Sequence, residues 1–215
     1  MNTRKEPRTK RKFLVRRARR ENVIPLSARL FWPFIGLLLT ISGTFLQAAV
    51  INMPWQWANG PSGFNLGVTY QVGAVLLTGC LAGRDGAIVS QFAYLILGLT
   101  SISVFAQGGG LDYWKEPSFG YILGFIPGSA LCGWLAFRKA NSLFNLTFSV
   151  FCGLFIIHLV GIVYLILLSR LSGNPSFLEL PSFFLHYSIY SLPGQFIVVS
   201  LASFASYLLR RILVY

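Results

Sequence analysis

The side chains of this sequence that could do chemistry are mostly amides and phenols, together with exposed backbone groups. Three consecutive glycines, Gly108 to Gly110, follow Gln107 and precede a run of aromatic and charged residues. Glycine triplets weaken helices and free the backbone for unusual turns, so their N–H groups can be offered to a ligand. Groups of this kind bind by hydrogen bonding and do not by themselves catalyse a reaction.

Further uncharged polar residues lie toward one end of the apolar segments. They are Asn65, Thr69, Tyr70, Gln71, Gln91, Tyr94, Gln107, Tyr121, Tyr190 and Gln195. Taken singly, each has an alternative role as a hydrogen-bonding contact between helices. Their clustering instead favours a cavity lined by rings and amides, which suits a small, mostly neutral ligand.

Signatures of catalysis and metal binding are missing from the sequence. No Gly-x-x-x-x-Gly-Lys-Ser/Thr phosphate loop occurs, and none of the six acidic residues is central in an apolar segment, which disfavours proton relays. His158 and His186 could share a metal, but without a third ligand we favour hydrogen-bonded helix packing. The three cysteines have no metal-ligand spacing and are expected to pack. We therefore predict no enzyme, no metal and no cofactor.

The composition places these groups in a membrane protein. Of 215 residues, 54% are hydrophobic and only 11% charged, whereas a soluble domain has about 25% charged residues. Six segments approach the roughly 20 residues needed to cross a bilayer. They are about Leu30–Ile51, Leu66–Ala82, Ala87–Phe105, Phe119–Phe137, Phe144–Ser169 and Phe183–Leu209. We predict an all-α fold, a compact bundle of six transmembrane helices, with a turn at Gly83-Arg84-Asp85-Gly86 between the second and third.

The distribution of basic residues predicts the orientation of the bundle. Sixteen of the 18 Lys and Arg residues fall on the side of the two termini, leaving Lys115 and Arg170 on the other. Positive charge marks the cytoplasmic side, so both termini are expected there. The tail, residues 1–29, could bind nucleic acid, lie on anionic lipid or enforce orientation. Orientation with lipid contact is favoured because the tail is tethered to a span; residues 30–215 form the membrane domain.

Several motifs are arranged in a recognisable order. Gly83/Gly86 is followed by Tyr94/Gly98, Ser103-Val104-Phe105-Ala106, Gly108–Gly110 and Pro117/Gly120/Tyr121/Gly124/Phe125. Val68–Gln71 (VTYQ) and Ile157–Gly161 (IHLVG) add to the pattern. In order and spacing, from about Leu66 to about Leu201, the sequence resembles BioY, the biotin-specific S component of energy-coupling factor (ECF) transporters.

The resemblance implies a substrate-capture subunit in the bacterial cell membrane. It would bind biotin from the outside and pass it inward with a separate transmembrane coupling protein and two ATPase subunits. The implied site residues are Gln71, Tyr94, Gln107, Gly108, Gly109, Gly110, Tyr121 and Gln195, with Phe105 and Trp114 as apolar contacts. Small residues on the first helix, Gly36, Thr40 and Gly43, are predicted to form a docking surface.

Two departures from the family pattern lie in the last segment. The family commonly has Pro-Gly-Asp-x-x-Lys there, whereas this chain has Gln195 and Val198 at the acidic and basic positions. A glutamine can still accept one ureido N–H or donate through its amide. Two alternatives therefore stay open: a capture subunit of the same fold for another vitamin, and a membrane scaffold that transports nothing.

Overall fold

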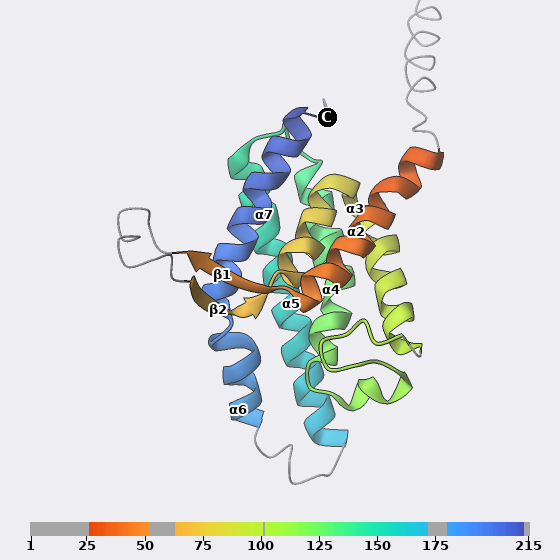
Figure 1. The fold of residues 1–215 in the computed structure, drawn as a ribbon, viewed down its shortest axis with the longest axis vertical. Helices are drawn as coiled ribbons and strands as arrows, with labels where there is room; N and C mark the ends of the chain where they lie inside the picture. Colours follow the sequence, from red (N-terminus) through yellow and green to blue (C-terminus); the bar gives the residue numbers. More distant parts are fainter. Residues whose placement is uncertain (1–25, 52–62, 101, 172–179, 213–215) are drawn as a thin grey trace, which may run out of the picture.

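Helices make up most of the chain in the computed structural model, which describes residues 26–51, 63–100, 102–171 and 180–212 (Figure 1). The helices are α2 (Leu26–Phe45), α3 (Gln71–Leu99), α4 (Phe119–Ala136), α5 (Leu143–Leu171), α6 (Leu180–Phe184) and α7 (Leu192–Ile212). A π-helical turn, η4 (Leu185–Ile189), joins α6 to α7. A 3-10 turn, η2 (Leu111–Lys115), lies between α3 and α4. Most of the predicted tail, residues 1–25, lies outside the described residues.

Within these ranges, four helical segments are long and apolar enough to cross a membrane: α3, α4, α5 and the stretch Leu180–Ile212. A shorter apolar helix covers Leu30–Phe45 within α2. Large apolar side chains such as Phe34, Phe148 and Phe155 are exposed. Lipid tolerates such surfaces and water does not, so the outer faces fit a bilayer.

Some predicted spans are confirmed and others need correction. Helices α4 and α5 cover the predicted fourth and fifth spans nearly end to end. Helix α3 runs through both the second and the third, with non-helical dihedral angles at Gly83 (φ 71°, ψ −173°) where the turn was predicted. The last predicted span is interrupted by η4 and a turn before α7.

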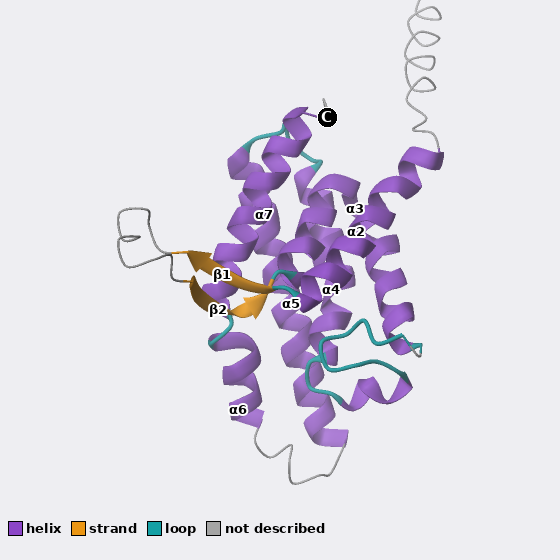
Figure 2. Cartoon of the chain, viewed as in Figure 1, coloured by secondary structure: helices purple, strands orange, loops and turns teal. Residues whose placement is uncertain are grey.

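The all-α prediction is wrong for the chain on either side of residues 52–62. Helix α2 ends at Phe45, and β1 (Gln47–Ile51) pairs with β2 (Gly63–Thr69) in an antiparallel hairpin, shown as orange arrows in Figure 2. Tyr70 N donates to Leu46 O at 3.0 Å and closes the base of the hairpin. Hydropathy cannot distinguish a short apolar strand from the end of a helix, which explains the error.

The described ends of the chain lie at the same end of the bundle. Figure 1 places the start of α2, the break in α3, the α4–α5 turn and the end of α7 together at the top, with η2 and α6 at the opposite end. Contacts agree with this view: Arg210 Nη1 donates to Ala136 O at 3.0 Å. A Cβ placed at Gly133 would lie 2.7 Å from Arg84 N.

Small residues bring the central helices close together. A Cβ at Gly124 would lie 2.8 Å from Ile157 O, and one at Gly128 would lie 2.9 Å from Gly153 O, so α4 and α5 meet backbone to backbone. The predicted docking surface on the first helix is wrong for the same reason. Gly36 and Gly43 face α3, and Thr40 is fully buried, so these residues pack inside the bundle.

Candidate functional site

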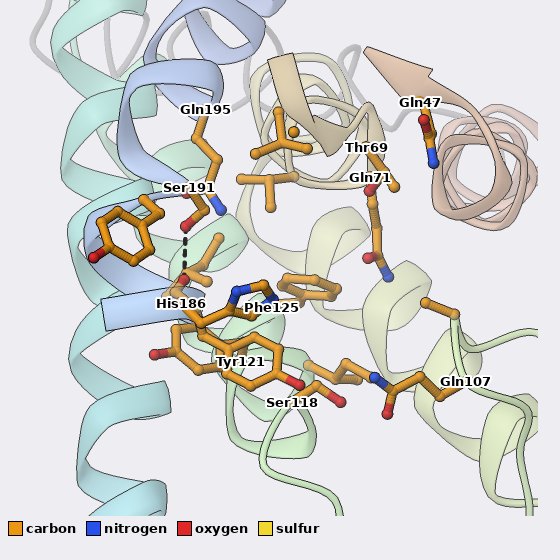
Figure 3. Close-up of a pocket in the computed structure, with 18 of the residues that line it drawn as sticks. Gln47, Thr69, Gln71, Gln107, Ser118, Tyr121, Phe125, His186, Ser191 and Gln195 are labelled. Carbon is orange, nitrogen blue, oxygen red and sulfur yellow. Dashed lines mark hydrogen bonds between the residues drawn. The ribbon is translucent and has the colours of Figure 1, made fainter. Parts of the chain in front are cut away.

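A cavity of about 530 Å³ lies between the hairpin, the start of α3, the α3–α4 loop, α4, α5 and the α6–α7 junction (Figure 3). Its volume is typical of a small-molecule site. The lining residues are Gln47, Asn65, Gly67, Val68, Thr69, Gln71, Val72, Ala106, Gln107, Tyr113, Ser118, Tyr121, Ile122, Phe125, Ile157, His186, Tyr187, Tyr190, Ser191 and Gln195. None of these described residues is Lys, Arg, Asp or Glu. The polar groups of the cavity are therefore amides, hydroxyls and the imidazole of His186.

The hairpin forms one wall and is fastened to α7. Asn65 Nδ2 donates to Gln47 Oε1 at 2.6 Å, and Gly67 N donates to Asn65 Oδ1 at 2.8 Å. A Cβ at Gly194 would lie 2.5 Å from Leu66 O, so α7 can approach this strand only because residue 194 has no side chain. These contacts hold Gln47 and Thr69 at the cavity.

Gln71, the first residue of α3, is oriented from behind the wall. Its Nε2 donates to Tyr94 OH at 2.9 Å. Tyr94 has one hydroxyl proton, and Val104 O, 3.1 Å away, can only accept it. The hydroxyl therefore accepts from the amide N–H, and Gln71 Oε1 is left to face the cavity as an acceptor.

Gln195 belongs to a hydrogen-bonded chain across α4, α5, η4 and α7. His158 Nε2 lies 2.7 Å from Gln195 Oε1, His158 Nδ1 lies 3.3 Å from Ser188 Oγ, and Ser188 Oγ lies 2.7 Å from Tyr121 OH. In one arrangement Nε2–H donates to Gln195, so the Gln195 amide N–H groups face the cavity. Reversing every bond makes Gln195 present its oxygen and Tyr121 its proton. Either way, one side of the Gln195 amide is held and the other is offered.

The break between α6 and α7 places several polar groups at the cavity. Pro193 lacks an N–H and its ring crowds the carbonyl of Ile189. These two effects of the proline end the preceding helix. Tyr190 N donates to Leu185 O at 2.8 Å in a π-type turn, and Ser191 Oγ donates to Tyr187 O at 2.7 Å. Such turns recur at functional sites in membrane helices because the irregular backbone lines a cavity.

The glycine-rich loop positions Gln107. Phe105 N donates to Gly108 O at 3.0 Å, Gly108 N returns to Phe105 O at 3.1 Å, and Gly110 N donates to Gly98 O at 2.8 Å. Gly108 (φ 111°) and Gly110 (φ 102°) adopt dihedral angles that favour glycine. A Cβ at Gly109 would lie 2.8 Å from Gly98 O. Two of the three N–H groups predicted for a ligand thus bond within the protein.

Other residues of the same loop complete the wall near η2. Tyr113 OH lies 3.2 Å from Ser118 Oγ, and both residues line the cavity. Burial raises the pKa of Tyr113, so its hydroxyl keeps its proton around neutral pH. It therefore remains a neutral donor at the cavity edge.

The structure brings together four of the ten predicted site residues at the cavity surface: Gln71, Gln107, Tyr121 and Gln195. The other six do not line it. Tyr94 and Phe105 are buried behind the wall with ring centroids 5.3 Å apart, and Trp114 is 49% exposed on η2. Gly108 to Gly110 shape the loop. These positions support the cavity from outside.

Asn65, Thr69 and Tyr190 were among the clustered polar residues expected at a cavity, and they line it. The sequence-based prediction missed the rest of the hairpin wall and much of the α6–α7 junction. Gln47, Ser118, His186, Tyr187 and Ser191 line the cavity without having been proposed for it. Alternation of polar and apolar residues in Asn65–Thr69 was the available indication of a strand. No comparable pattern marks His186 or Tyr187. Among the described residues, no cluster of three or more His, Cys, Asp or Glu could hold a metal.

Comparison with known proteins gives a consistent family pattern. Residues 27–214 match the BioY family. An uncharacterized 21.2 kDa protein of Cyanophora paradoxa, in the psbX-ycf33 intergenic region, is 31% identical over 184 residues, 86% of this chain and 95% of that protein. The biotin transporter BioY of Thermotoga maritima is 33% identical over 125 residues, 58% of this chain and 71% of that protein.

A second bacterial relative and one solved structure agree. The probable biotin transporter BioY of Lysinibacillus sphaericus is 36% identical over 98 residues, 45% of this chain and 50% of that protein. The crystal structure of the S-component for biotin from an ECF-type ABC transporter superimposes with a TM-score of 0.59. The superposition covers 89% of this chain and 93% of the chain in that crystal structure, and the two sequences are 23% identical. That likeness establishes a shared fold.

Proposed function

Because the chain belongs to the BioY family, we propose that it is the substrate-capture subunit of a biotin importer of the ECF type. Relatives named as biotin transporters support this function. The observation that carries it is the cavity of about 530 Å³, whose described lining consists of amides, hydroxyls, one imidazole (His186) and apolar side chains. Biotin offers a ureido ring with two N–H donors and one carbonyl, an apolar body and a terminal carboxylate, which matches that mixture.

In this proposal Gln71, Gln107, Tyr121 and Gln195 contact the ligand. The free oxygen of Gln71 accepts a ureido N–H, because Tyr94 already holds the amide nitrogen. Phe125 and Ile122 pack against the apolar body of biotin. Tyr94, Phe105, Gly108, Gly109, Gly110 and Trp114 hold the surrounding wall and loop in place.

The proposal also fixes the surroundings of the subunit. The chain crosses a bacterial cell membrane six times, with both termini in the cytoplasm and the cavity open to the outside. Sixteen of the 18 basic residues support that orientation. A separate transmembrane coupling protein and two ATPase subunits supply the energy, since this sequence has no phosphate loop.

Binding to the purified protein tests the function directly. We expect biotin to raise the melting temperature within a panel of vitamins, because a ligand that binds only the folded state stabilises it. The alternative, a capture subunit for another vitamin, is favoured by Gln195 and by Val198, which is buried against Gly73. A thermal shift with a different vitamin and none with biotin would establish that alternative. If no vitamin raises the melting temperature, the result would favour the other alternative, a membrane scaffold that transports nothing.

A further inference from the structure

The cavity has two chemically different sides. On one side, Gln71 presents an acceptor oxygen whose direction is fixed by its bond to Tyr94. On the other side, His186 extends from η4 toward the cavity (Figure 3). An imidazole donates an N–H in either protonation state and adds a positive charge when protonated.

His186 differs from every other described lining residue because it alone can carry a positive charge. Lys115, on the nearby loop, does not line the cavity and is paired with Asp112 at 2.5 Å. Ser191 lies on the His186 side, but its hydroxyl donates to Tyr187 O at 2.7 Å. An anionic group entering the cavity therefore finds its best partner at His186.

The setting of His186 suits a carboxylate that stays partly hydrated. The side chain is exposed, and its ring contacts Tyr187 edge to face, with centroids 5.1 Å apart. That contact restricts the ring to the cavity edge, while water still reaches it. A charge at this place avoids the cost of full burial.

We propose that His186 binds the anionic end of the ligand, a carboxylate, while the N–H end lies at Gln71. This assignment rests on the proposed function, and it gives the bound molecule a direction. An acceptor oxygen at Gln71 repels a carboxylate and attracts N–H groups. An elongated ligand therefore binds with its N–H end at Gln71 and its carboxylate at His186.

Equilibrium binding of biotin and biotin methyl ester to the wild type, H186A, H186Q and H186K tests the assignment. We expect H186A to weaken biotin binding roughly threefold to tenfold, as for a solvent-exposed charged hydrogen bond. The methyl ester, which carries no charge, should bind the wild type and H186A within about twofold of each other. H186K should restore the preference for the acid, and H186Q should restore less of it.

The outcomes separate the two proposals. Equal losses for acid and ester in H186A, or no loss for either, would overturn the assignment of His186 and leave the proposed function intact. Absence of biotin binding by the wild type would overturn the proposed function together with the assignment. Melting temperatures without ligand show whether each variant is folded. If H186A is not folded, the binding of acid and ester by H186K and H186Q is compared with that of the wild type instead.

Discussion

His158 and Gln195 face each other between α5 and α7, with 2.7 Å between His158 Nε2 and Gln195 Oε1. The imidazole continues through Ser188 to Tyr121, so residues from four elements share one line of hydrogen bonds. A buried network of this kind fixes side-chain positions that sequence spacing alone does not. Gln195 is thereby held at the cavity without a charged partner.

This pairing predicts a strong coupling between the two residues. We expect H158A and Q195A each to weaken biotin binding about tenfold. Q195A removes the hydrogen bond of Gln195 to the ligand and H158A removes the residue that positions Gln195, and either loss costs about 1–1.5 kcal/mol. The double variant should bind only slightly more weakly than either single variant, which a double-mutant cycle measures as a coupling of about 1 kcal/mol. Additive losses in that cycle would contradict the positioning role of His158.

Tyr94 should matter for binding although it does not line the cavity. In Y94F, Gln71 loses the hydroxyl that holds its Nε2, and Val104 O loses its donor. We expect biotin affinity to fall about fivefold and stability to fall by about 1–2 kcal/mol, measured by binding and thermal unfolding. Y207F is the matched control, because the Tyr207 hydroxyl has no hydrogen bond among the described residues and lies away from the cavity. Equal effects of the two variants would argue against orientation of Gln71 by Tyr94.

The glycine triplet should be sensitive at its centre. In G109V the new side chain collides with the carbonyl oxygens of Gly98 and Ile102, each 2.8 Å from the Cβ position. The loop must then shift and take Gln107 with it, so we expect loss of most biotin binding and a destabilisation of about 1–3 kcal/mol. G63A is the control because a Cβ there meets nothing within 4 Å. Retention of wild-type affinity in G109V would show that the loop does not shape the site.

The sequence predicted the helical framework where hydropathy and turn residues agreed. The break at Gly83 and the extents of α4 and α5 followed from apolar length bounded by Gly, Arg and Asn. The hairpin did not, because Gln47–Ile51 continues an apolar run, and its strand character depends on pairing with a distant segment. Tertiary contact decided that element.

The same distinction applies to the candidate site. Gln71, Gln107, Tyr121 and Gln195 could be predicted from residue type and family resemblance, and they line the cavity. Tyr94 on α3 and Phe105 in the following loop share those features yet lie behind the wall. The rotation of a helix about its axis and the path of a loop are both set by packing, which sequence spacing does not predict. His186 lies within the π-helical turn η4, an irregular element that hydropathy did not predict, and it lines the cavity from there.

Arg210 should contribute to stability without affecting the ligand. Arg210 is 4% exposed, and its guanidinium lies 4.1 Å from the centre of the Phe137 ring and donates to Ala136 O at 3.0 Å. We expect R210L to lower stability by about 1–3 kcal/mol, since it removes a charged hydrogen bond and a cation–π contact. The neighbouring exposed residue gives the control R211L, which should change stability by less than about 0.5 kcal/mol. Biotin affinity should stay within about twofold of the wild type in both variants, since the contacts of Arg210 lie at the end of the bundle away from η2 and α6. A large loss of affinity in R210L with unchanged melting would contradict this separation between the stabilising contact and the binding site.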